Sequence, residues 1–189
     1  MKTITIYRYS ELSEQAQSRV LESSEHEQIK EQLWNTTETD LIEEVLMPKL
    51  TAQGLMDVDI RYTGFWSQGD GLSFTAEVSD PETFCQAIGM DYREHLWSGI
   101  GLEIVRGQSR YLHERTCSIR IESSESESHE LSRYLFTLEN RAEAWRLEQC
   151  QDMYRTLERA YYAATGYESV HGVLLEEEEE LYLEDGHRA

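Results

Sequence analysis

The chain contains the stretch MDVDIRYT at residues 56–63 and, after a glycine-rich connection, the stretch LSFTAEV at residues 72–78. In both stretches apolar and polar side chains alternate, which is the period of a β-strand with one buried face. Two such strands joined by a short connection predict an antiparallel hairpin. Residues 102–106 and 117–121 predict a second pair of strands, and residues 2–8 predict one more. We therefore expect an antiparallel sheet of about five strands.

A long helical pattern follows this β-rich middle. From Leu131 to Ala164 apolar side chains recur every three or four positions, as on one face of an α-helix. One helix over about 129–165 would be roughly 55 Å long at ~1.5 Å per residue, which exceeds the width of a domain of this size. Such a helix must break near Glu139-Asn140, project from the domain, or pair with a second copy, and pairing would give a homodimer. With helices on one face of the sheet, the predicted fold class is α+β.

Shorter helices are predicted from their ends. Ser13 is a candidate N-cap before one apolar stripe, and Asp80-Pro81 is typical of a helix start. Pro48 is expected to kink or end the helix that contains residues 41–46. We expect a single domain over residues 1–166, followed by an acidic C-terminal tail over 167–189.

The charge of the chain limits its partners. Among 189 residues, 37 acidic against 17 basic side chains give a formal net charge of −20, which argues against direct binding to nucleic acid or to an anionic membrane. No apolar run is long enough to span a membrane, and the start lacks the features of a secretory signal. Three isolated cysteines predict buried free thiols rather than disulfides or a zinc site. These features predict a cytoplasmic protein.

The most distinctive segment is GFWSQGDG at residues 64–71, between the two strands of the first hairpin. Its glycines permit close approach of the backbone, and its aromatic and polar side chains suit the binding of a ligand or a protein partner. The alternative is a purely structural turn whose aromatic rings cover the end of the sheet. The candidate binding residues are Phe65, Trp66, Gln68 and Asp70.

Evidence for catalysis is thin. The chain has no H-E-x-x-H or G-x-S-x-G motif. His113-Glu114 is the one pair that suggests acid–base chemistry, although a loop of mixed charge explains it as well. We therefore predict no catalytic residue, no metal ligand and no cofactor, and a protein that is not an enzyme. A run of acidic side chains near the C-terminus is a candidate interaction surface: Glu176, Glu177, Glu178, Glu179 and Glu180.

The order of these motifs resembles a family of proteins of unknown role encoded by tailed phages and prophages. The resemblance rests on a first strand followed by Glu11-Leu12-Ser13 and Ala16, on Gly64–Gly71 followed by Ser73-Phe74, and on the closing Glu184-Asp185-Gly186. Leu72 departs from the family pattern, in which a small residue is usual. The resemblance implies a phage setting and no mechanism.

In that setting the acidity suggests a function. A strongly acidic protein can occupy the basic groove of a nucleic-acid enzyme, because its carboxylates take the places of phosphates. We expect an accessory protein that binds and inhibits a host protein by such mimicry, or that binds a host protein in another way. The alternative is a small-ligand module in which the Gly64–Gly71 loop binds a nucleotide signal.

Overall fold

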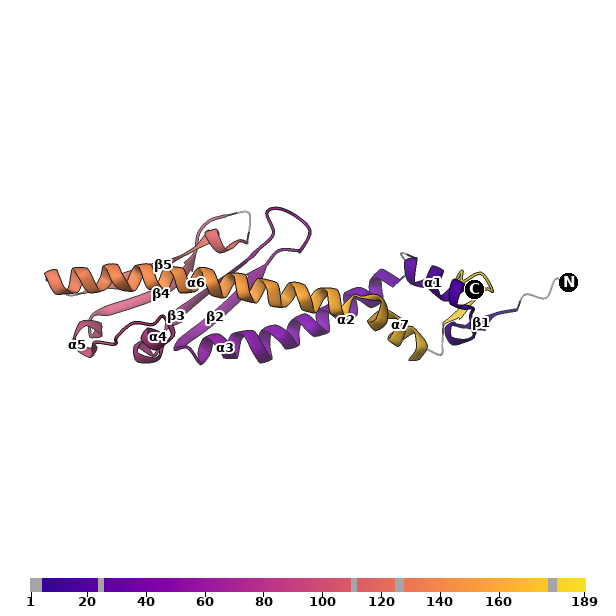
Figure 1. Cartoon of the computed structure of the whole chain (residues 1–189), viewed down its shortest axis with the longest axis horizontal. Helices are drawn as coiled ribbons and strands as arrows, with labels where there is room; N and C mark the ends of the chain where they lie inside the picture. Colours follow the sequence, from indigo (N-terminus) through magenta and orange to yellow (C-terminus); the bar gives the residue numbers. More distant parts are fainter. Residues whose placement is uncertain (1–4, 24–25, 110–111, 125–127, 177–179) are drawn as a thin grey trace. The chain divides into compact units, whose positions relative to one another are not determined.

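The computed structural model describes residues 5–23, 26–109, 112–124, 128–176 and 180–189 (Figure 1). The chain divides into two compact units. We call residues 40–158 the central unit, and residues 1–39 together with 159–189 the terminal unit.

The central unit contains a four-stranded antiparallel sheet in the order β2-β3-β4-β5. Its strands are β2 (Leu55–Tyr62), β3 (Leu72–Val78), β4 (Ile100–Arg106) and β5 (Cys117–Ser123). Both predicted strand pairs are confirmed. Tyr62 pairs with Leu72, so the glycine-rich segment begins and ends where the first hairpin ends.

The long helix α6 (His129–Ala164) is continuous, without a break at Glu139-Asn140. Over the central unit, its Trp145 ring meets Phe74 of β3 and Phe84 of α4 (Pro81–Ala87), with ring centroids 6.2 and 5.3 Å apart. The predicted apolar stripe is buried within the chain, including Leu131, Leu138, Ala142, Met153 and Leu157. This burial takes place within one chain, and the homodimer stays a prediction.

The opposite face of the sheet is polar. Glu77, Glu103 and Arg120 lie side by side on β3, β4 and β5, and the last two form an ion pair of 3.5 Å. An antiparallel sheet with one apolar and one charged face places its helices on the apolar side. The α+β class is thereby confirmed.

Pro48 does not end its helix. Helix α2 (Glu27–Asp40) runs into a π-helical turn η3 (Leu41–Leu46) and then into α3 (Met47–Thr51), with Pro48 in the first turn of α3. A proline inside a continuous helical run removes one backbone hydrogen bond and crowds the preceding turn, and the π-helical turn η3 ends two residues before Pro48. The chain turns instead at Gly54, whose φ of +89° suits glycine.

The terminal unit has a small sheet of its own, in which β1 (Tyr7–Arg8) pairs with β6 (Leu181–Tyr182). The strand predicted near the N-terminus therefore does not join the larger sheet. Ser13 caps α1 (Glu14–Glu22) as predicted, since its hydroxyl accepts a hydrogen bond from Ala16 N.

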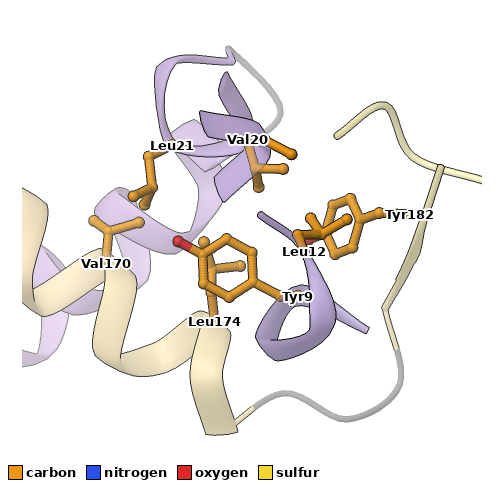
Figure 2. Packing of buried hydrophobic residues seen from close by; sticks show 8 residues of the cluster. Tyr9, Leu12, Val20, Leu21, Val170, Leu174 and Tyr182 are labelled. Atoms are coloured by element: carbon orange, nitrogen blue, oxygen red, sulfur yellow. The ribbon is translucent and has the colours of Figure 1, made fainter. Parts of the chain in front are cut away.

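The region expected to be an acidic tail contributes to the core of the terminal unit. It contains α7 (Tyr167–Glu176) as well as β6. Figure 2 shows Val170, Leu174 and Tyr182 from this region packed with Tyr9, Leu12, Val20 and Leu21. Tyr9 also hydrogen-bonds His171 Nδ1 through its hydroxyl at 2.7 Å.

Candidate functional site

The segment Gly64–Gly71, called the Trp66 loop below, is shaped by the carboxylate of Asp70. One oxygen of this carboxylate accepts hydrogen bonds from the backbone N–H groups of Trp66 and Ser67, at 2.8 and 2.7 Å. The N–H of Asp70 in turn donates to the Ser67 carbonyl at 3.0 Å. An aspartate that closes a turn on its own backbone orders a loop without help from a ligand. Asp70, predicted as a binding residue, therefore holds the loop in shape.

Phe65 and Trp66 are neighbours with opposite surroundings. Phe65 is buried, stacked on Tyr62 with centroids 5.4 Å apart, and lies 5.5 Å from the ring of Tyr154. The Tyr154 hydroxyl of α6 also donates to the Gly64 carbonyl at 3.0 Å. Trp66, in contrast, is 69% exposed. The base of the loop is thus anchored on α6, while an indole ring is presented to solvent.

Gln68 is exposed near Trp66. Of the four predicted binding residues, Trp66 and Gln68 are therefore placed to contact another molecule, while Phe65 and Asp70 support them. The structural interpretation of the loop and the binding interpretation are compatible, because different residues carry them.

The end of the loop packs against His113. A Cβ atom at Gly71 would lie 2.9 Å from Cδ2 of His113, so only glycine fits there without a shift. The Nδ1 atom of His113 lies 2.8 Å from the Glu114 carboxylate at the start of the short turn η4 (Glu114–Thr116). His113 therefore contacts both the loop and the carboxylate of Glu114, and its role here is to support the loop.

A charged cluster that the sequence analysis did not predict lies behind η4. Arg146 of α6 is only 1% exposed. Its guanidinium donates to the Glu143 carboxylate, to the Glu114 carbonyl, and to the sulfur of Cys117 at 3.0 Å. The sulfur of Cys150 lies 4.0 Å from the same guanidinium. We call Cys117, Glu143, Arg146 and Cys150 the Arg146 cluster.

The two thiols of this cluster have opposite acidities. The hydrogen bond from Cys150 and the nearby Arg146 cation together outweigh burial and lower the pKa of Cys117 to about 6. The pKa of Cys150 is raised, first by that shared hydrogen bond and then by burial. The lowered pKa favours the thiolate form of Cys117 beside the buried arginine, whose charge is also balanced by the Glu143 carboxylate.

Burial limits what this thiolate can do. A nucleophilic cysteine needs access to its substrate as well as a lowered pKa, and Cys117 is only 3% exposed. The cluster therefore has a structural role. Arg146 of α6 hydrogen-bonds the backbone of η4, and His113, which directly precedes η4, packs against Gly71 at the end of the Trp66 loop.

The predicted acidic surface is only partly described. Glu176 is exposed at the end of α7, whereas Glu180 forms an ion pair of 2.7 Å with Arg188 and accepts a hydrogen bond from the Tyr182 hydroxyl. Glu177, Glu178 and Glu179 lie outside the described residues. Within the described ranges, no group of three or more histidine, cysteine or acidic side chains is arranged to hold a metal ion.

None of the helices in the described part of the chain is both long enough and apolar enough to cross a membrane.

In comparison with known families, residues 28–166 match a domain of unknown function, DUF8835, and the chain belongs to that family. No curated protein and no solved structure matches it.

Proposed function

We propose that this member of the DUF8835 family is a protein-binding module and that the Trp66 loop contacts its partner. The observation that carries the proposal is a tryptophan that is 69% exposed on a loop held by its own hydrogen bonds. Tryptophan is enriched among the residues that dominate binding energies in protein interfaces. A loop that is already ordered loses little conformational entropy when it binds.

The charge of the protein indicates the kind of partner. A net charge of −20 attracts basic surfaces and accelerates encounter with them. Mimicry of nucleic acid requires in addition a continuous row of carboxylates. Helix α6 has six acidic and five basic side chains, so it is close to neutral. We therefore assign the contact to the Trp66 loop and give the acidity the role of attracting a basic partner.

In the phage setting that the sequence resemblance implies, the partner would be a host protein in the cytoplasm and binding would inhibit it. The nucleotide-signal alternative receives less support from the loop. The only charged side chain of the loop is the carboxylate of Asp70, and it already accepts hydrogen bonds from two backbone N–H groups. A basic protein with an apolar pocket for the indole ring suits the loop better than a nucleotide does.

The test is a pull-down from a lysate of the host cell with three forms of the chain: wild type, Trp66→Ala and Phe136→Ala. Phe136 is a matched control because its ring is also 69% exposed in the central unit. We expect a partner that wild type and Phe136→Ala retain and that Trp66→Ala loses. Equal retention by all three forms would contradict the role of Trp66.

Elution in steps of rising salt tests the charge separately. Attraction between exposed charges is screened beyond about 8 Å at physiological ionic strength. We expect the partner to be basic and to elute at moderate salt. A partner that stays bound in high salt would leave the Trp66 contact intact and would contradict the electrostatic part of the proposal.

A further inference from the structure

A groove of about 490 Å³ lies in the central unit, between the segment that follows α4 and the first half of α6. This volume is within the range of sites for small molecules, roughly 300–1,000 Å³. Its α6 side carries polar residues spaced by four positions: His129, Arg133, Thr137 and Arg141. Side chains with this spacing lie on one face of a helix, so they form a row along the groove.

Three arginines reach this groove, which we call the arginine groove. Arg93 donates to the Glu130 carboxylate at 2.9 Å, and its guanidinium carbon lies 5.8 Å from the centre of the Tyr134 ring. Arg141 donates to the backbone carbonyl of Gly89. Arg133 is exposed, and no described residue forms an ion pair or a hydrogen bond with its guanidinium.

The local charge is opposite to that of the whole protein. The groove is lined by three arginines and His129 against two acids, Asp91 and Glu130, in a chain with a net charge of −20. Arg93 is paired with Glu130, whereas Arg133 and Arg141 form no ion pair with a described acid. These two cations can attract an anion.

The wall of the groove is fixed in place. The Tyr134 hydroxyl accepts a hydrogen bond from Trp97 Nε1 at 2.8 Å and donates to the Asp91 carbonyl at 3.2 Å. Tyr134 and Trp97 are both buried, so they hold the segment from Asp91 to Arg93 against α6. Arginines placed on a fixed wall and on a helix keep their separation when the ligand is absent.

We propose that the arginine groove binds a small molecule that carries more than one phosphate group. Guanidinium groups pair with phosphate through two parallel hydrogen bonds, which makes arginine the usual residue for phosphate recognition. Arg133 and Arg141 are two helical turns apart, about 12 Å along the axis. A ligand with linked phosphate groups offers one group to each of these arginines. This site is distinct from the Trp66 loop and does not depend on the function proposed for that loop.

The test is calorimetric titration of the full chain with inorganic pyrophosphate and with ATP at low salt. We expect saturable binding of one ligand per chain. Arg133→Gln should weaken it at least about tenfold, because a charge-assisted pair is lost. Arg155→Gln is the matched control, since Arg155 is an exposed arginine of α6 outside the groove. Tighter binding of ATP than of inorganic triphosphate, titrated as a third ligand, would show that the nucleoside also contacts the groove.

Three results would overturn the proposal. The first is absence of binding at millimolar pyrophosphate and ATP. The second is equal weakening by Arg133→Gln and Arg155→Gln, which would mean that general charge is responsible. The third is equally tight binding of citrate, which would mean that the groove does not select phosphate. Trp66→Ala should leave the titration unchanged, so failure here is separable from failure of the protein-binding proposal.

Discussion

The Trp66 loop and the Arg146 cluster depart from the usual distribution of side chains in opposite directions. The loop exposes a large apolar ring, and the cluster buries a charged group. A buried charge is the rarer of the two features, because single exposed apolar side chains are common on protein surfaces. The exposed ring costs little stability and is accessible from solvent, whereas the buried charge is tolerated only because its partners are in place.

The two regions are also linked. Arg146 holds the backbone of η4, and His113, which precedes η4, packs on Gly71 at the end of the loop. The comparison therefore separates Trp66, whose ring lies on the surface, from the buried residues around Arg146 that hold the loop in position. Variants on each side should differ sharply in their effect on stability.

The largest effect is expected for Arg146→Ala. Removal of one partner from a buried ion pair typically costs about 3–5 kcal/mol of unfolding free energy. Here it would remove the cation beside the Glu143 carboxylate and the Cys117 sulfur, and with it the guanidinium hydrogen bond to the Glu114 carbonyl. Urea denaturation measures the loss. Arg155→Ala, at an exposed position of the same helix, should change stability by less than about 0.5 kcal/mol. Similar values for both variants would mean that the cluster is not a buried pair.

The next effect compares the two adjacent aromatic residues. Phe65→Ala should cost about 3 kcal/mol because it removes a buried ring from contact with Tyr62 and Tyr154. Trp66→Ala should stay within about 0.5 kcal/mol, since its ring is mostly in solvent. Thermal or urea unfolding of the two variants decides between the functional and the structural interpretation of Trp66. A large loss for Trp66→Ala would make this ring part of the core.

Alternation and helical period were sufficient to predict most of the central unit. They located both strand pairs because each strand has one buried face, and they located α6 because its stripe is uninterrupted. They could not predict β6, since two residues at the end of an acidic run carry no alternation. Its pairing with β1 depends on contacts between the two ends of the chain.

The position of the candidate site could be predicted from the sequence, but the role of each of its residues could not. The glycines and aromatic residues identified the Trp66 loop, yet the sequence did not tell that Asp70 would bind its own backbone. Arg146 lies four residues after Ala142 and four before Cys150, on the buried face of α6. That spacing was a signal for burial, and Glu143 lies one turn away on the same helix, but the partners from β5 and η4 are visible only in three dimensions.

A smaller effect is expected for Asp70→Ala. The variant removes an acceptor shared by two backbone N–H groups at a partly exposed position, so we expect a loss of about 1–2 kcal/mol. The loop should also become more mobile, which amide hydrogen exchange at Trp66 and Ser67 measures. Asp70→Asn should retain part of the order because its carbonyl oxygen still accepts. Unchanged exchange in Asp70→Ala would mean that Phe65 and Tyr154 alone hold the loop.

The last prediction concerns the pH dependence of stability that the Arg146 cluster creates. The pKa of Cys117 is lowered to about 6 in the folded chain from an ordinary value of 9.0. Between these values the unfolded chain holds a proton that the folded chain has released, so stability rises with pH, and it is lost as pH falls through 6. Above about 9 the raised pKa of Cys150 opposes a further gain, because the unfolded chain then ionises more readily.

Over one pH unit near neutrality the gain should be about 1 kcal/mol, since one proton contributes at most about 1.4 kcal/mol per unit. Urea midpoints at pH 6.5 and 7.5 measure it. Cys117→Ser should remove the gain, because a serine hydroxyl does not ionise in this range. Cys85→Ser is the control: Cys85 is also buried, but burial raises the pKa of its thiol, so this variant should lose stability equally at both pH values. A gain that persists in Cys117→Ser would mean that Arg146 is balanced by Glu143 alone and that Cys117 stays protonated.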